Sequence, residues 1–224
     1  MDLSETSLPT PPASPSGRAT CAAPGLGDDA VPATAPSSAA FAPAPEPSAA
    51  QVALVGAVRE IEQHVAAAGW DRGITVFALV PTATILENEP NLDESLAVEM
   101  RAYVAADPGH LTSIPQDLSS SSQDLSVLLA QLVWPPAVVG MALTAERIVL
   151  PQAAEDEAPA DAAARDEFLL NHPARQDVRL AVGVLRTGES WCAVRMRAHD
   201  SDDAVAGGID LAPDLVAAAL ATFQ

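Results

Sequence analysis

Apolar residues from position 51 onward recur in patterns that are typical of helices and strands. Residues 51–69 carry five aliphatic side chains at helical spacing and end at Gly69, which predicts a helix. These side chains belong to Leu54, Val55, Val58, Ile61 and Val65. Residues 74–80 form a continuous apolar run closed by Pro81, which favours a buried strand.

Helical and extended segments continue toward position 172. Thr82 is placed to cap a short helix through Leu86. Further helices are predicted over 92–106, with Leu96, Met100 and Val104 near one face, over 124–134, with a serine as its cap, and over 164–172. Residues 110–118 are predicted to be extended, 137–150 to form a long strand, and 151–163 to form an acidic loop.

The C-terminal fifty residues predict a hairpin followed by a helix. Residues 177–186 and 190–199 flank Thr-Gly-Glu, where Gly188 suits a tight turn, so the two strands should pair antiparallel. Alternation predicts a solvated face and a core face for the second strand. The solvated face would hold Trp191, Ala193, Arg195, Arg197 and His199, and the core face Cys192, Val194, Met196 and Ala198. The last helix begins near Pro213 and turns Leu215, Val216, Ala219 and Leu220 inward.

Together these elements predict a single α+β domain over residues 51–224, with a mostly antiparallel sheet, a C-terminal hairpin and flanking helices. Residues 1–50 contain ten of the twenty prolines and few large apolar residues, so we expect a disordered tail. The tail has three interpretations: a solubilising appendage, an over-long gene start or a Pro-rich recognition arm.

Charge and composition exclude several classes of function. The chain has 11 Lys+Arg against 30 Asp+Glu, a net charge of −19, and every one of the cations is arginine. Without lysine there is no Schiff-base chemistry, no covalent pyridoxal phosphate and no phosphate-loop lysine. The acidic balance argues against nucleic acid and anionic membranes as partners. The acidic N-terminus lacks the features of a signal peptide, and Cys21 and Cys192 offer no disulfide framework, so we expect a cytoplasmic protein.

Several separated stretches of the chain resemble segments of a known protein family. They are residues 58–71, 76–86, 134–151, 172–186 and 195–205. In this order they are similar to an uncharacterised family of small acidic cytoplasmic proteins of actinobacteria. The resemblance covers residues 51–224 and implies no activity, so it assigns no catalytic residue.

The densest polar cluster lies in the stretch RMRAHDSDD. Its candidate site residues are Arg195, Arg197, His199, Asp200, Asp202 and Asp203. The aspartates offer oxygens for a divalent cation, but the calcium-hand spacing fails after two ligands, and zinc needs more than one histidine. The arginines have the donors to bind a carboxylate or phosphate, and they can equally neutralise the neighbouring aspartates. The plainest interpretation is a solvated strand end followed by a turn.

Two functions compete at this point. The first is a non-enzymatic cytoplasmic protein that binds a protein partner, with no cofactor and no metal. The second is a small-molecule or divalent-metal-dependent enzyme centred on residues 195–203. An enzyme requires these groups to converge with a second acid or histidine at the floor of a pocket, whereas groups that splay into solvent argue against it.

Overall fold

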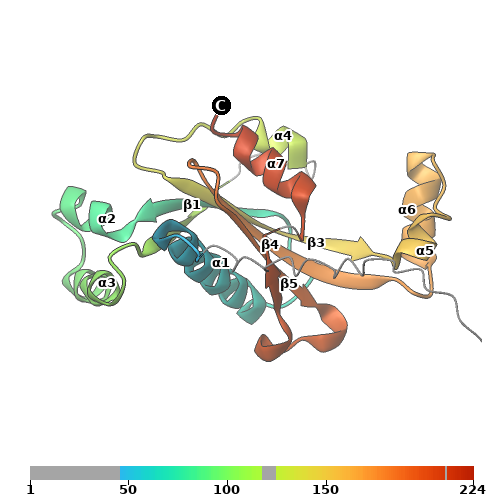
Figure 1. Cartoon of the computed structure of the whole chain (residues 1–224), viewed down its shortest axis with the longest axis horizontal. Coiled ribbons are helices and arrows are strands. Elements are labelled where there is room, and N and C mark those ends of the chain that lie inside the picture. The colour runs from blue at the N-terminus through green and yellow to red at the C-terminus, as the bar shows by residue number, and fades with distance from the viewer. Residues whose placement is uncertain (1–45, 118–124, 210) are drawn as a thin grey trace, which may run out of the picture. The chain divides into compact units, whose positions relative to one another are not determined.

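The computed structural model describes residues 46–117, 125–209 and 211–224, which build a six-stranded antiparallel sheet with helices on both faces (Figure 1). The strands are β1 (Thr75–Pro81), β2 (Leu111–Gln116), β3 (Gly140–Val149), β4 (Gln176–Leu185), β5 (Ser190–Met196) and β6 (Ala206–Gly208). Their order in the sheet is β2-β1-β3-β4-β5-β6, and every neighbouring pair is antiparallel. The predicted α+β class and the β4–β5 hairpin are confirmed.

Seven α-helices lie within the described residues. They are α1 (Ala49–Ala67), α2 (Thr82–Asn88), α3 (Glu94–Ala106), α4 (Leu125–Leu129), α5 (Gln152–Glu155), α6 (Ala162–Asn171) and α7 (Pro213–Ala221). Short 3₁₀ turns at Arg197–His199 and Asp202–Ala204 follow β5. Among the described helices, none combines the length and the hydropathy that a membrane span requires.

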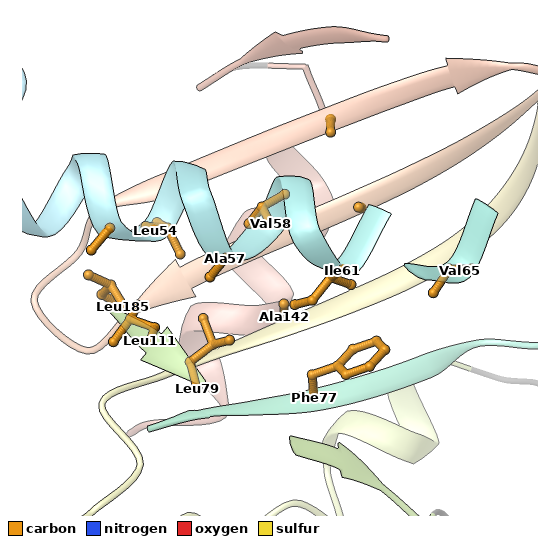
Figure 2. Close-up of a cluster of buried hydrophobic side chains, with 13 residues drawn as sticks. Leu54, Ala57, Val58, Ile61, Val65, Phe77, Leu79, Leu111, Ala142 and Leu185 are labelled. Atoms are coloured by element: carbon orange, nitrogen blue, oxygen red, sulfur yellow. The ribbon is translucent and has the colours of Figure 1, made fainter. Parts of the chain in front are cut away.

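Helix α1 covers one face of the sheet and packs a stripe of buried apolar side chains against it. Its buried side chains point toward those of β1, β3 and β4 (Figure 2). The predicted stripe is confirmed at Leu54, Val58, Ile61 and Val65, all of which are buried. The helix begins within the predicted tail, because Ser48 caps it by accepting a hydrogen bond from the Gln51 backbone N–H at 3.0 Å. Residues 1–45 of that tail lie outside the described residues.

The other face of the sheet is covered by α4 and α7 (Figure 1). Leu215, Val216 and Leu220 pack here with buried Ala219, as the sequence predicts. The strand positions that meet them are buried and apolar; they are Val76, Met141, Leu143, Ala145, Val182, Val184 and Cys192. A sheet with apolar residues on both faces explains why β1 is an almost continuous apolar run and why β3 and β4 contain apolar runs at 140–143 and 180–185.

Three local predictions need correction. Thr82 does not cap α2, because its hydroxyl is buried and lies 2.7 Å from both His110 Nδ1 and Thr112 Oγ1. The predicted acidic loop contains α5, which is one turn long. In α3, Met100 is buried, but Leu96, which was predicted on the same face, is 44% exposed, and Ala97 is buried in its place. The predicted serine cap of the 124–134 helix lies outside the described residues.

Both edges of the sheet are poor templates for further strand pairing. The β2 edge carries Pro115, which has no backbone N–H to donate. The β6 edge is three residues long and includes Gly207 and Gly208. Association through an added strand is therefore disfavoured at either edge.

The packing of α1 on β4 predicts opposite effects of the same substitution at two glycines. A Cβ at Gly183 collides with Val58 Cγ2, a stiff side chain in the core, whereas a Cβ at Gly56 on the exposed side of α1 meets nothing within 4 Å. We expect Gly183→Ala to lower the free energy of unfolding by about 1–3 kcal/mol and Gly56→Ala to raise it by about 0.5–1 kcal/mol. Urea denaturation of both variants tests this, and a stabilised Gly183→Ala would show that α1 does not pack as described.

Candidate functional site

Three charged side chains form a row across the sheet beneath the C-terminal half of α1. The strand register places Glu146 of β3 opposite Arg179 of β4, and Arg179 opposite Arg195 of β5. Two arginines directly opposite each other repel, so this row requires anions from elsewhere in the chain. They come from α1 and from the segment after β5.

Arg195 is the centre of the cluster, with only 2% of its surface exposed. Its Nε and Nη2 donate to Glu62 Oε1 and Oε2 of α1 at 2.6 and 2.8 Å, and Glu62 is equally buried. The same guanidinium reaches forward along the chain, donating to Asp200 Oδ1 at 3.2 Å and to Asp202 Oδ1 at 2.6 Å. One arginine is thus shared by three carboxylates.

The prediction of a solvated strand face is therefore wrong at two positions. Arg195 and Ala193 are buried beneath α1, because the sheet is covered on this side as well as on the other. On the predicted core face Cys192 is buried, whereas Val194 and Met196 are only half-buried. The strand ends at Met196, so the alternation does not extend to Arg197, Ala198 and His199, which are exposed.

Trp70, in the turn after α1, contacts both Asp200 and Arg179. Its indole N–H donates to Asp200 Oδ2 at 2.8 Å, and the guanidinium of Arg179 lies 4.3 Å from the centre of its ring. Arg179 is 1% exposed and donates through Nη2 to the Gly69 carbonyl and to Glu146 Oε1, the latter at 3.1 Å. A cation at this place also suits the negative end of the helix dipole of α1.

Arg197 forms a second, solvent-facing part of the network. Its two Nη atoms donate to the two carboxylate oxygens of Asp71 at 2.8 and 2.7 Å. Asp71 has a φ of 64°, in the left-handed region, and its backbone N–H donates to Glu146 Oε2 at 2.9 Å. The turn after α1 is therefore held from two sides, by Arg197 and by Glu146.

The remaining predicted site residues lie outside the buried part of the cluster. His199 is exposed, and its ring makes no hydrogen bond or ion pair with any described residue. Asp203 is exposed and accepts a hydrogen bond from Ser201. Of the six predicted residues, the structure brings together Arg195, Asp200 and Asp202, and it directs Arg197 to Asp71.

Hydrogen bonds and ion pairs shift the pKa values of three charged groups in this region away from neutral pH. The hydrogen bonds from Trp70 and Arg195 hold the pKa of Asp200 below its ordinary value, despite partial desolvation. Arg197 likewise lowers the pKa of Asp71, and Glu62 raises the pKa of Arg195. A general acid or base needs a pKa near the working pH, and none of these three groups meets that requirement.

A metal does not fit this arrangement. The carboxylate oxygens of Glu62 and Asp202 already accept from Arg195, whose positive charge occupies the place that a cation would take. Within the described ranges there is no group of three or more His, Cys, Asp or Glu placed to hold a metal ion.

Glu62, Arg179 and Glu146 belong to the cluster and were not predicted. A signal for Glu62 is present in the sequence, since it lies four residues after Val58 and three before Val65, within the buried stripe. The position of Arg179 follows from the hairpin: a turn centred on Thr187 places it opposite Arg195. No comparable local signal identifies Glu146.

The buried pair predicts a large and asymmetric response to substitution. Arg195→Leu leaves Glu62 buried without its cation, so we expect it to lower the free energy of unfolding by about 3–5 kcal/mol. Arg197→Leu breaks an exposed pair and should have a much smaller effect. Replacing both Glu62 and Arg195 by leucine should recover much of the loss, because no buried charge is then left unpaired, while Asp200 and Asp202 stay in contact with water.

Urea denaturation followed by circular dichroism measures all three variants. Equal losses for Arg195→Leu and Arg197→Leu would contradict the assignment of Arg195 as the buried centre of the cluster.

The lowered pKa of Asp200 predicts a pH-dependent stability difference. A carboxyl group whose pKa is depressed by folding stabilises the folded state above its ordinary pKa, and this contribution is lost as the pH falls through the lowered value. Asp200→Asn should therefore be less stable than the parent at neutral pH, and the difference should narrow as the pH falls from about 4 toward 2. A difference that stays constant over this range would show that Asp200 is not stabilised as a carboxylate.

Comparison with known proteins gives one result. No curated protein and no solved structure matches the chain. A family model described as PPA1309-like protein matches residues 54–224, which include every described element from the first turns of α1 to α7. The chain therefore belongs to the PPA1309-like family.

Proposed function

We propose that this protein is a non-enzymatic binding protein that docks an apolar, positively charged segment of a partner protein. The observation that carries the proposal is a preformed apolar groove at the N-terminal end of α1. We further propose the cytoplasm of an actinobacterium as its location, in keeping with the sequence resemblance.

The groove has a volume of about 510 Å³, within the usual range for binding pockets. Its walls come from α1, the end of β1, the start of β2 and the turn of the β4–β5 hairpin. They are formed chiefly by Ala50, Ala53, Pro81, Leu111, Val139 and Leu185. Small side chains on α1 leave room for a larger apolar side chain from outside. Burying such a side chain is favourable in proportion to the apolar area removed from water.

Charge favours a basic partner segment. The chain carries a net charge of −19, and Glu46, Asp107 and Glu189 each lie within three residues of a position that lines the groove. The cation at the rim, Arg186, is already engaged, because it donates to the Val138 and Trp134 carbonyls and lies 4.6 Å from the centre of the Phe223 ring. A Lys or Arg side chain of the partner would therefore meet carboxylates that Arg186 does not neutralise.

The alternative, a small-molecule or divalent-metal-dependent enzyme centred on residues 195–203, has less support. Arg195 and Arg197 already form ion pairs with carboxylates of the chain itself, and His199 makes no contact with either of them among the described residues. The acids that converge on Arg195 are bound to it as carboxylates, so they are poorly placed to exchange protons with a substrate.

Site-specific photocrosslinking in a native lysate tests the proposal. A benzophenone side chain is placed at Thr187, which is exposed beside the groove, and in a control protein at Ala217, which is exposed on α7 across the sheet. We expect protein adducts at position 187 only, formed by segments that combine apolar residues with Lys or Arg. A synthetic peptide of the captured sequence should bind the full chain more weakly as the salt concentration rises.

The variant Ala50→Glu supplies a second control. It places a carboxylate at the mouth of the groove, where an acid in the first turn of α1 is compatible with the helix. It should abolish capture of the apolar segment while the protein stays folded. Equal adducts at positions 187 and 217, no adducts at either, or captured segments without basic residues would overturn the proposal.

A further inference from the structure

The walls of the apolar groove at the N-terminal end of α1 offer few hydrogen-bonding atoms to a bound segment. Val139 has both backbone groups engaged, because its N–H donates to the Leu79 carbonyl at 3.0 Å and its carbonyl accepts from the Arg186 N–H at 2.8 Å. The backbone N–H and carbonyl of Leu185 are paired within the hairpin turn, at 2.9 and 3.0 Å. Ala53 lies inside α1, where helical hydrogen bonds use its backbone groups. A ligand therefore meets mainly apolar surface.

The polar groups at the rim of the groove are engaged as well. The guanidinium of Arg186 donates to backbone carbonyls of the loop before β3. The hydroxyl of Thr187 donates to the carboxylate of Glu189, and the backbone N–H of Gly109 donates to Asp107 Oδ1 at 2.9 Å. The backbone of a docked segment would thus find few partners here.

This shortage of partners restricts the conformation of whatever docks. An extended segment pressed onto these walls would bury its own N–H and C=O groups unpaired, which is costly. An extended segment regains such bonds by adding to a free sheet edge, but the β2 and β6 edges are both poor templates. An α-helix pairs its backbone groups internally and presents only side chains to the groove.

Helix α1 is suited to contact with a second helix. The residues with which it lines the groove are all alanines on one side of the helix: Ala49, Ala50 and Ala53. Side chains of this size let two helices approach closely. Val52 is 53% exposed and extends the apolar surface along α1 beyond the groove. Figure 2 shows Leu111 and Leu185 beneath the part of α1 that carries Leu54, where a large side chain would enter.

We infer that the partner segment binds as an amphipathic α-helix beside the N-terminal half of α1. One large apolar side chain of this helix enters the groove, a second contacts Val52, and Lys or Arg residues flank the apolar stripe. This inference rests on the proposed function, which requires only that an apolar, basic segment fills the groove. It adds the conformation of that segment and its contact with Val52.

Two peptide libraries of equal composition test the inference by display selection on the immobilised full chain. Both contain apolar residues of varied size together with Lys and Arg. In one library the apolar positions recur every three or four residues, and in the other they recur at every second residue. We expect binders from the helical library alone. Ala50→Glu should abolish their binding, whereas Ala217→Glu, which adds the same charge on the exposed side of α7, should leave it unchanged.

Fluorescence anisotropy of a labelled selected peptide then tests its bound conformation. Proline in place of a central Lys or Arg should weaken binding by about tenfold or more relative to alanine at the same place, because both remove the charge and only proline interrupts the helix. In the protein, Val52→Ser should weaken binding severalfold. Val127→Ser, an exposed valine of α4 on the opposite face of the sheet, should leave the affinity unchanged.

The outcomes separate the inference from the proposed function. Binders from the alternating library, or helical binders that tolerate proline or Val52→Ser, overturn the helical mode; the groove keeps its proposed role if Ala50→Glu abolishes their binding. No binders from either library, or binders that Ala50→Glu does not affect, overturn both.

Discussion

Glu62 and Arg195 are both about 2% exposed, and the ion pair that they form joins α1 to β5 beneath the surface. Removing two charges from water is costly, and the cost is offset only where the geometry is good and the remaining hydrogen-bonding capacity is used. Here both conditions hold, since the pair is bidentate and Arg195 also binds Asp200 and Asp202. The position of α1 along the sheet and the path of the chain after β5 therefore depend on this one guanidinium.

The residues that pack against α1 differ between its N-terminal and C-terminal halves. Toward the N-terminus, Ala50, Ala53 and Leu54 meet apolar strand residues, and small side chains leave the apolar groove open. Toward the C-terminus, Glu62 pairs with Arg195, Arg179 lies opposite Arg195 on the neighbouring strand, and the helix ends over this polar floor. The surroundings of one helix thus differ from end to end, because the strands beneath it change from apolar to charged along their length.

Much of the fold was predictable because its signals are local. The stripe on α1, the run closed by Pro81 and the turn at Gly188 each follow from a few adjacent residues, and Gly188 indeed has a φ of 103°. The site was predictable only in part. A strand covered on one face shows alternation, and β5 does so in its sequence, yet α1 covers the face on which Arg195 lies. Glu62 is 133 residues away from Arg195, and local patterns do not encode contacts at such separations.

Hydrogen-bond accounting separates Arg195, a structural cation, from Arg59, which lies near it on α1. Arg195 uses Nε, Nη1 and Nη2 in four hydrogen bonds to three carboxylates, an arrangement that a lysine, with one ammonium group, would not reproduce. Arg59, an exposed residue of α1, makes no such bond with the described residues. Because the chain has no lysine, both roles fall to arginine, and composition alone does not distinguish them. What distinguishes them is burial: Arg195 is 2% exposed among carboxylates that require its charge, whereas Arg59 is exposed on α1.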